Sequence, residues 1–126
     1  MPFLACHLIP YLVLFTMTYK ISYYSIAVQQ DIRKLPETLI ARYFALTDRM
    51  VTHGANLGAP HTQPMGDGLF ELRLKGTDGI ARVFYCTLVG KRIVMLHCFV
   101  KKTQKTPSRE LHTAQTRMKE IKNAHA

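Results

Sequence analysis

The sequence contains few acidic residues. Eight Asp and Glu stand against 17 Lys and Arg in a chain of 126 residues, which gives a formal net charge of +9. This imbalance favours a polyanionic partner, such as nucleic acid, an anionic membrane or an acidic protein. The charge is concentrated between residues 71 and 105, where eight basic residues accompany two acidic ones.

Cysteine is also scarce. Cys6, Cys86 and Cys98 are odd in number and lack metal-ligand spacing, which argues against a disulfide framework and a zinc site and favours a reduced cytosolic chain. The sequence offers no Gly-rich phosphate loop, and "HTQPMGDG" holds one histidine and one aspartate without a metal cluster. We therefore expect no metal and no cofactor.

No hydrophobic run is long enough for a membrane span. Residues 1–16, "MPFLACHLIPYLVLFT", are uncharged and mostly apolar, but Pro10 interrupts them, and a transmembrane helix needs about 20 apolar residues. A signal peptide would begin with positive charge, which is missing here. Because a strand-like segment starts directly after Met17, we expect residues 1–16 to be an upstream extension or leader. Residues 17–126 are then a single cytoplasmic domain.

Hydrophobic periodicity predicts an α+β domain in the order β-α-α-β-β-β-α. A first strand covers residues 18–24, a short helix capped by Ser25 ends at Pro36, and a longer helix covers residues 37–53 before Gly54. Residues 54–68 are expected to form a loop. Strands follow at 69–75, 80–87 and 92–100, the last one central because it is apolar on both faces.

The C-terminal helix is predicted over residues 108–121, with Thr106 as its N-cap and Pro107 at its first position. Its apolar stripe is narrow, so it should lie on the surface of the domain. We expect the helical hairpin to cover one face of a small, mainly antiparallel sheet, whose core side carries Phe70, Leu72, Leu74, Ala81, Val83 and Tyr85.

Two arginines flank the turn "GTDG" at mirrored distances. If Lys75 pairs with Ile80, Arg73 lies opposite Arg82. Like charges directly across a strand pair are destabilising, so we expect an anion from outside the fold to compensate them. The alternative is a solvated strand face on which Glu71 pairs with Arg73.

The same sheet face is predicted to carry Lys75 and, on the last strand, His97 or Phe99 beside Arg82. Guanidinium groups suit phosphates, and aromatic rings suit unstacked bases. His97 could equally be a satisfied core histidine. The lysines at 101, 102 and 105 either bind an anion before the last helix or form a solubilising linker.

Residues 69–118, which include "ELR" before a G-x-x-G turn, "RVFY", an L-H-x-F strand and "KKTQKTP", resemble the phage-derived Gp49-like, HigB-like branch of the RelE/ParE toxin superfamily. The similarity extends over roughly residues 17–121. It implies a RelE-like fold and a toxin of a type II toxin-antitoxin pair that cuts mRNA on the ribosome without a cofactor. Its partner would be a helix-turn-helix, HigA-like antitoxin encoded next to it.

The resemblance also implies roles for individual residues. Arg82 matches the strand arginine that contacts the scissile phosphate, Arg73 matches the basic residue of the preceding strand, and Lys102 or Lys101 matches the basic residue that ends the last strand. The residues expected to bind RNA around these three are Lys75, His97, Lys101, Gln104 and Lys105.

Two other functions stay open at this point. A ParE-like inhibitor of DNA gyrase would use the same fold without a phosphate pocket, and a prophage remnant would have no activity. The chain also lacks a tyrosine after "KKTQKTP", and His112 is the candidate to replace one.

Overall fold

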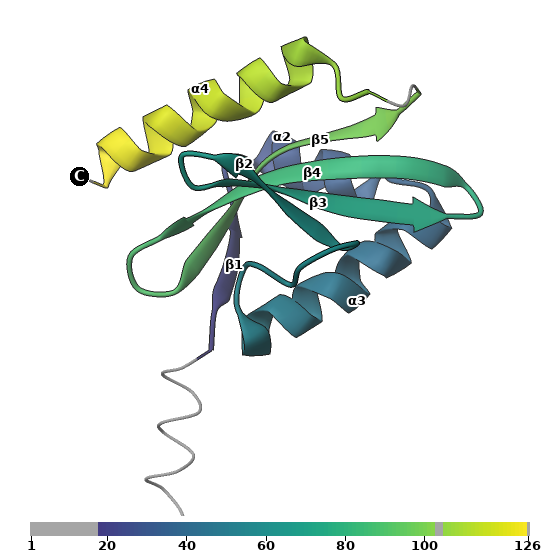
Figure 1. The fold of residues 1–126 in the computed structure, drawn as a ribbon, viewed down its shortest axis with the longest axis horizontal. Helices are drawn as coiled ribbons and strands as arrows, with labels where there is room; N and C mark the ends of the chain where they lie inside the picture. The colour runs from purple at the N-terminus through teal and green to yellow at the C-terminus, as the bar shows by residue number, and fades with distance from the viewer. Residues whose placement is uncertain (1–17, 103–104, 126) are drawn as a thin grey trace, which may run out of the picture.

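A five-stranded sheet forms the centre of the fold (Figure 1). The computed structural model describes residues 18–102 and 105–125, so the expected leader at 1–16, with Cys6, and also Gln104 lie outside the described residues. Its elements are β1 Lys20–Tyr23, α2 Ile26–Arg33, α3 Glu37–His53, β2 Thr62–Gly66, β3 Leu69–Gly76, β4 Gly79–Leu88, β5 Arg92–Lys101 and α4 Ser108–Ala124.

The strand order is β1-β5-β4-β3-β2, and every neighbouring pair is antiparallel except β1 with β5. The predicted α+β class and the mainly antiparallel sheet are therefore confirmed. Strand β5 is an interior strand, between β1 and β4, while β4 occupies the middle of the sheet. Residues 81–86 of β4 are all buried, as expected for a strand with a neighbour on each side and helices over both faces.

The helical hairpin of α2 and α3 covers the predicted core face. Leu72, Leu74, Ala81, Val83 and Tyr85 are buried there against Ile32, Leu39, Tyr43, Leu46 and Met50 of the two helices, and Phe70 packs at the margin of this cluster. The helix bounds also match the prediction. The Ser25 hydroxyl accepts a hydrogen bond from the Val28 amide at 3.2 Å, and the Gly54 amide donates to the Met50 carbonyl at 2.8 Å.

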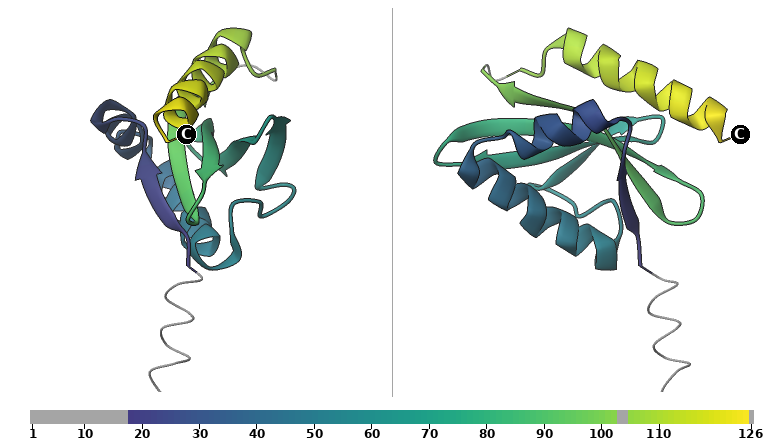
Figure 2. Two further views of the ribbon diagram at one scale, coloured as in Figure 1. Left: turned by 90° about the vertical axis from the view of Figure 1, so that its left-hand side faces the viewer. Right: turned by 180° about the vertical axis from the view of Figure 1, so that it is seen from behind.

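The opposite face is not left to solvent, because α4 packs across it (Figure 2). The stripe of Leu111, Ala114, Met118 and Ile121 meets a second apolar cluster on the sheet, made of Leu69, Phe84, Cys86, Val94 and Leu96. The predicted hairpin on one face and separate C-terminal helix are therefore confirmed, while the cover that α4 gives to the opposite face was not predicted. The apolar residues on both faces of β5 were the available signal, since a strand that is apolar on both sides needs cover on both sides.

The predicted loop at 54–68 contains a strand, β2, which the sequence analysis missed. It pairs with β3 alone, from Thr62 with Leu72 to Gly66 with Leu69, and a bulge follows Pro64. An edge strand tolerates proline because one row of its backbone groups needs no partner, and it needs no apolar alternation when only one neighbour holds it. Backbone pairing, which leaves no sequence pattern here, creates this strand.

The N-terminus of α4 also differs from the prediction. Pro107 occupies the N-cap position, and the side chain of Thr106 does not cap the helix. Its hydroxyl instead donates to Glu71 Oε2 at 3.1 Å, which ties the segment before α4 to strand β3. None of the helices in the described ranges 18–102 and 105–125 combines the length and hydropathy of a membrane span.

The turn between β3 and β4 is docked onto the N-terminus of α3. Asp78 Oδ2 accepts hydrogen bonds from the Thr38 amide at 3.1 Å and from the Thr38 hydroxyl at 2.7 Å, and these bonds lower the pKa of Asp78. Pro36 provides no side-chain cap for α3, so a carboxylate from the hairpin takes that role. The helix and the strand pair are thereby held in one arrangement.

Replacing Gly76 by alanine is expected to destabilise the protein by about 1–3 kcal/mol. A Cβ at this position would lie 2.6 Å from Thr38 Oγ1 and 2.9 Å from Thr38 Cβ, so the hairpin must move away from α3. Urea unfolding measures the loss. Thr77→Ala, in the same exposed turn, is the matched control and should leave the free energy of unfolding unchanged within about 0.5 kcal/mol. Equal stability of the two variants would contradict the docking.

Candidate phosphate-binding site

The pairing of β3 with β4 places Arg73 directly opposite Arg82, and Lys75 opposite Ile80, as the sequence predicts. Phe99 of β5 is the partner of Arg82 on the other side. Because α4 covers the other part of this sheet face, the arginines lie near its uncovered end, next to the Thr77–Asp78 turn.

A β-bulge brings the β5 side chains onto this face. Leu88 pairs with Arg92, and three residues connect them. The register then shifts by one between Phe84 and Tyr85, so that His97 and Phe99 lie on the side of Arg82 while Cys98 packs into the core under α2 and α3. A bulge re-aims side chains in this way. The bulge therefore places Phe99 beside Arg82, as the sequence predicts.

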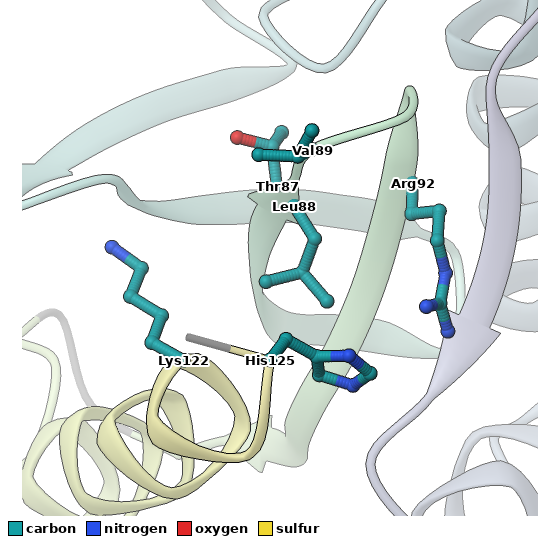
Figure 3. A pocket seen from close by; sticks show the side chains of 6 residues that line it. All are labelled: Thr87, Leu88, Val89, Arg92, Lys122 and His125. Carbon is teal, nitrogen blue, oxygen red and sulfur yellow. The ribbon is translucent and has the colours of Figure 1, made fainter.

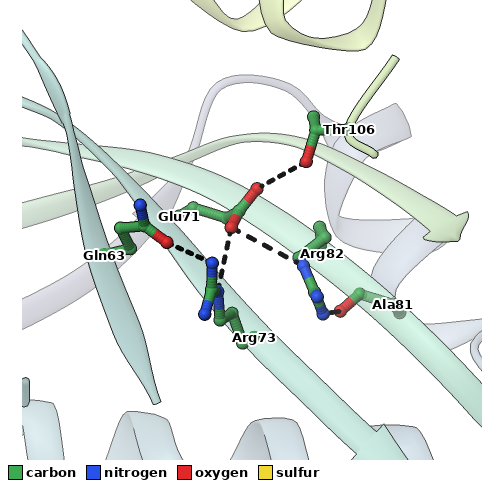
Figure 4. Close-up of polar contacts among 6 residues, drawn as sticks. All are labelled: Gln63, Glu71, Arg73, Ala81, Arg82 and Thr106. Atoms are coloured by element: carbon green, nitrogen blue, oxygen red, sulfur yellow. Dashed lines mark hydrogen bonds and ion pairs between the residues drawn. The ribbon is translucent and has the colours of Figure 1, made fainter. Parts of the chain in front are cut away.

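Glu71 is the centre of the polar contacts at this end of the sheet (Figure 4). Its side chain is only 2% exposed, and Oε1 lies 3.2 Å from Arg73 Nε and 3.6 Å from Arg82 Nε. The second carboxylate oxygen accepts the Thr106 hydroxyl. Arg73 also donates from Nη2 to Gln63 Oε1 on β2. The alternative that Glu71 pairs with Arg73 is therefore confirmed, and this carboxylate supplies part of the compensating charge from within the fold.

Arg82 keeps unused hydrogen-bonding capacity. Its side chain is 11% exposed, Nη1 donates to the Ala81 carbonyl at 3.2 Å, and Nε is buried without a hydrogen-bond partner among the described residues. Burial lowers the pKa of this guanidinium, the Glu71 charge opposes that shift and Arg73 adds to it. One carboxylate faces two guanidiniums, so the group carries net positive charge.

Of the two candidate lysines at the end of β5, the structure brings Lys101 to the arginines. Lys101 pairs with Ile80 and lies two residues beyond Phe99, on the face of Arg82. Its pKa is lowered by burial and by the charges of Arg82 and Arg73, while Glu71 opposes these effects. Lys102 follows the end of the strand and is exposed, as is Lys105.

Lys75, Arg73 and Arg82 line a pocket of about 310 Å³. The sequence predicted these three residues as neighbours, but not the rest of the lining. The other lining residues are Arg42, Pro60, His61 and Ile80. Arg42 belongs to α3, and His61 immediately precedes β2. Nothing in the sequence connects them to Arg73, because only the docking of α3 and the missed strand β2 bring them to this edge.

His97 contacts α4 rather than the pocket. Its Nε2 bonds Glu110, and its Nδ1 lies 3.4 Å from Arg117 Nη1, which also donates to the Leu96 carbonyl at 2.8 Å. Both ring nitrogens thus hold the helix on the sheet. Phe99 stacks on His97, whereas Phe84 is fully buried under α4. Among the predicted aromatic rings, the partly exposed Phe99 is therefore the one beside Arg82 that an RNA base could contact.

Two further pockets lie along the C-terminal half of α4. One, of about 370 Å³, lies between the β4–β5 turn and the end of α4 and is lined by Thr87, Leu88, Val89, Arg92, Lys122 and His125 (Figure 3). The other is lined in part by Gly66, His112 and Lys122. Neither includes Arg73 or Arg82, so His112 is not brought to the arginine pair. Across the described part of the chain, no three His, Cys, Asp or Glu side chains cluster as metal ligands would.

The fold is that of the RelE toxins. It matches an arginine-substituted mutant of the E. coli toxin RelE in the free state with a TM-score of 0.60 and 12% sequence identity, over 80% of this chain and 98% of that chain. The RelE–RelB complex from the archaeon Pyrococcus horikoshii aligns with a TM-score of 0.49 and 21% identity, over 68% of this chain and 98% of that chain. No curated protein matches the sequence.

The sequence places the chain within one family of this fold. Residues 30–119 match the family model described as phage derived protein Gp49-like (DUF891). The match spans more than half of the chain, and the chain belongs to this family. The predicted relationship to the phage-derived Gp49-like branch of the RelE/ParE superfamily is thus confirmed.

Glu71→Gln is expected to destabilise the protein by about 1–3 kcal/mol, because it leaves the buried Arg82 guanidinium without its counter-charge. The measurement is denaturant unfolding at pH 7. Asp48→Asn, which removes an exposed carboxylate that has no hydrogen bond or ion pair among the described residues, is the control and should have little effect. If both variants were equally stable, Glu71 would not be the internal anion of the site.

Proposed function

We propose that this chain is the toxin of a type II toxin-antitoxin system and acts as a ribosome-dependent mRNA endonuclease. The observation that carries the proposal is the arginine pair itself. Arg73 and Arg82 face each other across β3 and β4, a single carboxylate serves both, and Arg82 Nε is buried without a hydrogen-bond partner in the described chain. Such a group suits a phosphate better than a protein target. The family and the fold support the toxin assignment.

In the proposed reaction, the 2′-hydroxyl of the RNA loses its proton and attacks the adjacent phosphorus. The bond to the 5′-oxygen of the next nucleotide breaks, and this oxygen takes a proton from water. Arg82 and Arg73 bind the non-bridging oxygens and stabilise the negative charge of the pentacoordinate phosphorane. Their positions are fixed in advance by Glu71 and Gln63, so little reorganisation accompanies the reaction. Because the attacking hydroxyl belongs to the RNA, no water has to be activated, and in this proposal the two arginines supply the positive charge that the phosphorane requires.

Lys101 is the proposed proton acceptor for the 2′-hydroxyl. A lysine can act as a base only when it is neutral, and burial beside Arg82 lowers its pKa in that direction. This assignment favours Lys101 over Lys102, for which the sequence left the choice open. Lys75, Lys102, Lys105 and Gln104 are proposed to bind the flanking RNA. His97 would act indirectly, by holding α4 in place.

The proposed partner is an antitoxin of the helix-turn-helix, HigA-like type, encoded in the adjacent gene. The exposed basic residues of the site would attract an acidic or extended segment of it. Binding of this segment over Arg73 and Lys101 would block access of RNA.

Replacing Arg82 by alanine is expected to abolish growth inhibition and to reduce message cleavage by about 10²–10³-fold, since one donor to the developing charge is lost. Cleavage is mapped by primer extension on messages after induction of the full chain. Arg33→Ala, which removes an exposed cation from α2, is the matched control and should cut like the unmodified protein.

The Arg82→Ala variant should still co-purify with the adjacent gene product, which shows that it folds. If induction of the unmodified protein arrests growth while the messages stay intact, the target is instead DNA gyrase or another protein. The absence of arrest would point to an inactive prophage remnant. A fully toxic Arg82→Ala variant would overturn the phosphate site.

The rate of single-turnover cleavage on ribosomes is expected to rise with pH below the pKa of Lys101, because the fraction of neutral amine rises about tenfold per pH unit. Lys101→Arg keeps the positive charge but cannot lose it near neutral pH, so this variant should be slower by about 10²-fold and nearly independent of pH. Lys102→Arg is the matched control and should keep the slope. A pH slope retained in Lys101→Arg would exclude Lys101 as the base.

A further inference from the structure

The free edge of β3 carries a second group of basic residues next to the arginine pair. Strand β2 pairs with β3 only up to Leu72, and the Arg73 amide then donates to the His61 carbonyl at 2.8 Å. Beyond this point β2 no longer follows the edge. The pocket of about 310 Å³ lies here, and it joins Arg42 of α3 and His61 to Arg73, Lys75 and Arg82.

The helix side of this edge is positively charged. Arg42 and Arg49 are two turns apart on the exposed side of α3, and neither forms an ion pair with a carboxylate of the described chain. His61 and Arg42 line the same pocket, and partial burial, together with the charges of Arg49 and Arg42, lowers the pKa of His61. His61 is therefore neutral at physiological pH and can donate a hydrogen bond, while the two arginines supply the charge.

The pocket is therefore lined both by the sheet, through β3 and β4, and by helix α3. Arg73 and Arg82 reach it from the face that α4 shares, whereas Arg42 reaches it from the helix that packs on the opposite face. No acidic side chain lines it. A ligand with one phosphate would need only the arginine pair, so the basic residues around the edge suit a ligand with more than one phosphate.

We infer that Arg42, Arg49 and His61 bind the backbone of the same single-stranded RNA at a phosphate that flanks the scissile one, so that the strand passes around the free edge of β3 onto α3. This inference rests on the proposed endonuclease function and names the path of its substrate. Neither the family nor the fold comparison assigns a role to these three residues. They would set how tightly and in which direction the RNA is held, without taking part in bond cleavage.

The test is the salt dependence of RNA binding by the full chain. The probe is a single-stranded RNA with 2′-O-methyl groups, which cannot be cleaved, titrated at several KCl concentrations. For single strands, each lost phosphate contact makes the slope of log K against log salt shallower by about 0.7, so Arg42→Gln/Arg49→Gln, which removes the contact with the flanking phosphate, should make the slope shallower by about 0.7. Arg33→Gln/Lys119→Gln removes the same charge at exposed positions away from the pocket and should keep the slope.

Oligonucleotide length gives a second readout. A dinucleotide has one phosphate, so the unmodified protein and Arg42→Gln/Arg49→Gln should bind it equally, and only the unmodified protein should gain affinity with a tetranucleotide. The inference would be overturned if Arg42→Gln/Arg49→Gln kept the salt slope of the unmodified protein, or gained as much affinity from the dinucleotide to the tetranucleotide. The endonuclease proposal would remain intact in both cases. If Arg42→Gln/Arg49→Gln bound free RNA normally and only its binding to ribosomes were weaker, the contact would be with ribosomal RNA, and the inference would be overturned.

If the unmodified protein binds no RNA, free or on ribosomes, the proposed function fails and the inference fails with it. That result differs from the preceding ones because no binding would then be measured in any titration, with the unmodified protein or with either variant. Both α3 positions are exposed, so the double variant is expected to fold. Thermal unfolding of the double variant verifies this before binding is measured.

Discussion

The antiparallel pairing of β3 with β4 is the constraint on which the candidate site depends. The two-residue turn fixes the register, and the register places Arg73 opposite Arg82. Asp78 in this turn holds the N-terminus of α3, so the hairpin cannot shift without also undoing the helix. Two like charges are thereby brought together by backbone geometry, and the fold answers with a buried carboxylate from the same strand.

Glu71 resolves the repulsion only in part. It satisfies Arg73 through Nε and approaches Arg82 at 3.6 Å, yet Arg82 Nε remains without a hydrogen bond. A fully neutralised pair would have no reason to bind an anion, and an uncompensated pair would destabilise the strands. One shared carboxylate gives an intermediate state, in which the arginines are held in place and keep the net positive charge on which the proposed phosphate contact depends. The Thr106 hydroxyl links the same carboxylate to the segment that follows Lys101.

Helix α4 decides which part of the sheet face remains available. Its apolar stripe buries Phe84 and Cys86, and the contacts of His97 with Glu110 and Arg117 anchor its N-terminal half. The surface left for a ligand is therefore the end that carries Arg73, Lys75 and Lys101, together with the open edge of β3. Helix α4, which the sequence placed on the surface of the domain, therefore limits the candidate site to this end of the sheet.

The sequence determined most of the elements and the arginine pair. Alternation in β3, the glycines of its turn and the spacing of Arg73 and Arg82 were sufficient, because these relations are local and a hairpin register follows from its turn. The sequence did not determine β2, the bulge that turns His97 and Phe99 toward Arg82, the role of Glu71, or the approach of Arg42 and His61. Backbone pairing of neighbouring strands creates β2 and the bulge without a periodic signal in the side chains. Glu71 meets Arg82 only across the strand pair, and Arg42 reaches the pocket only through the docking of α3, so the tertiary structure decides these features.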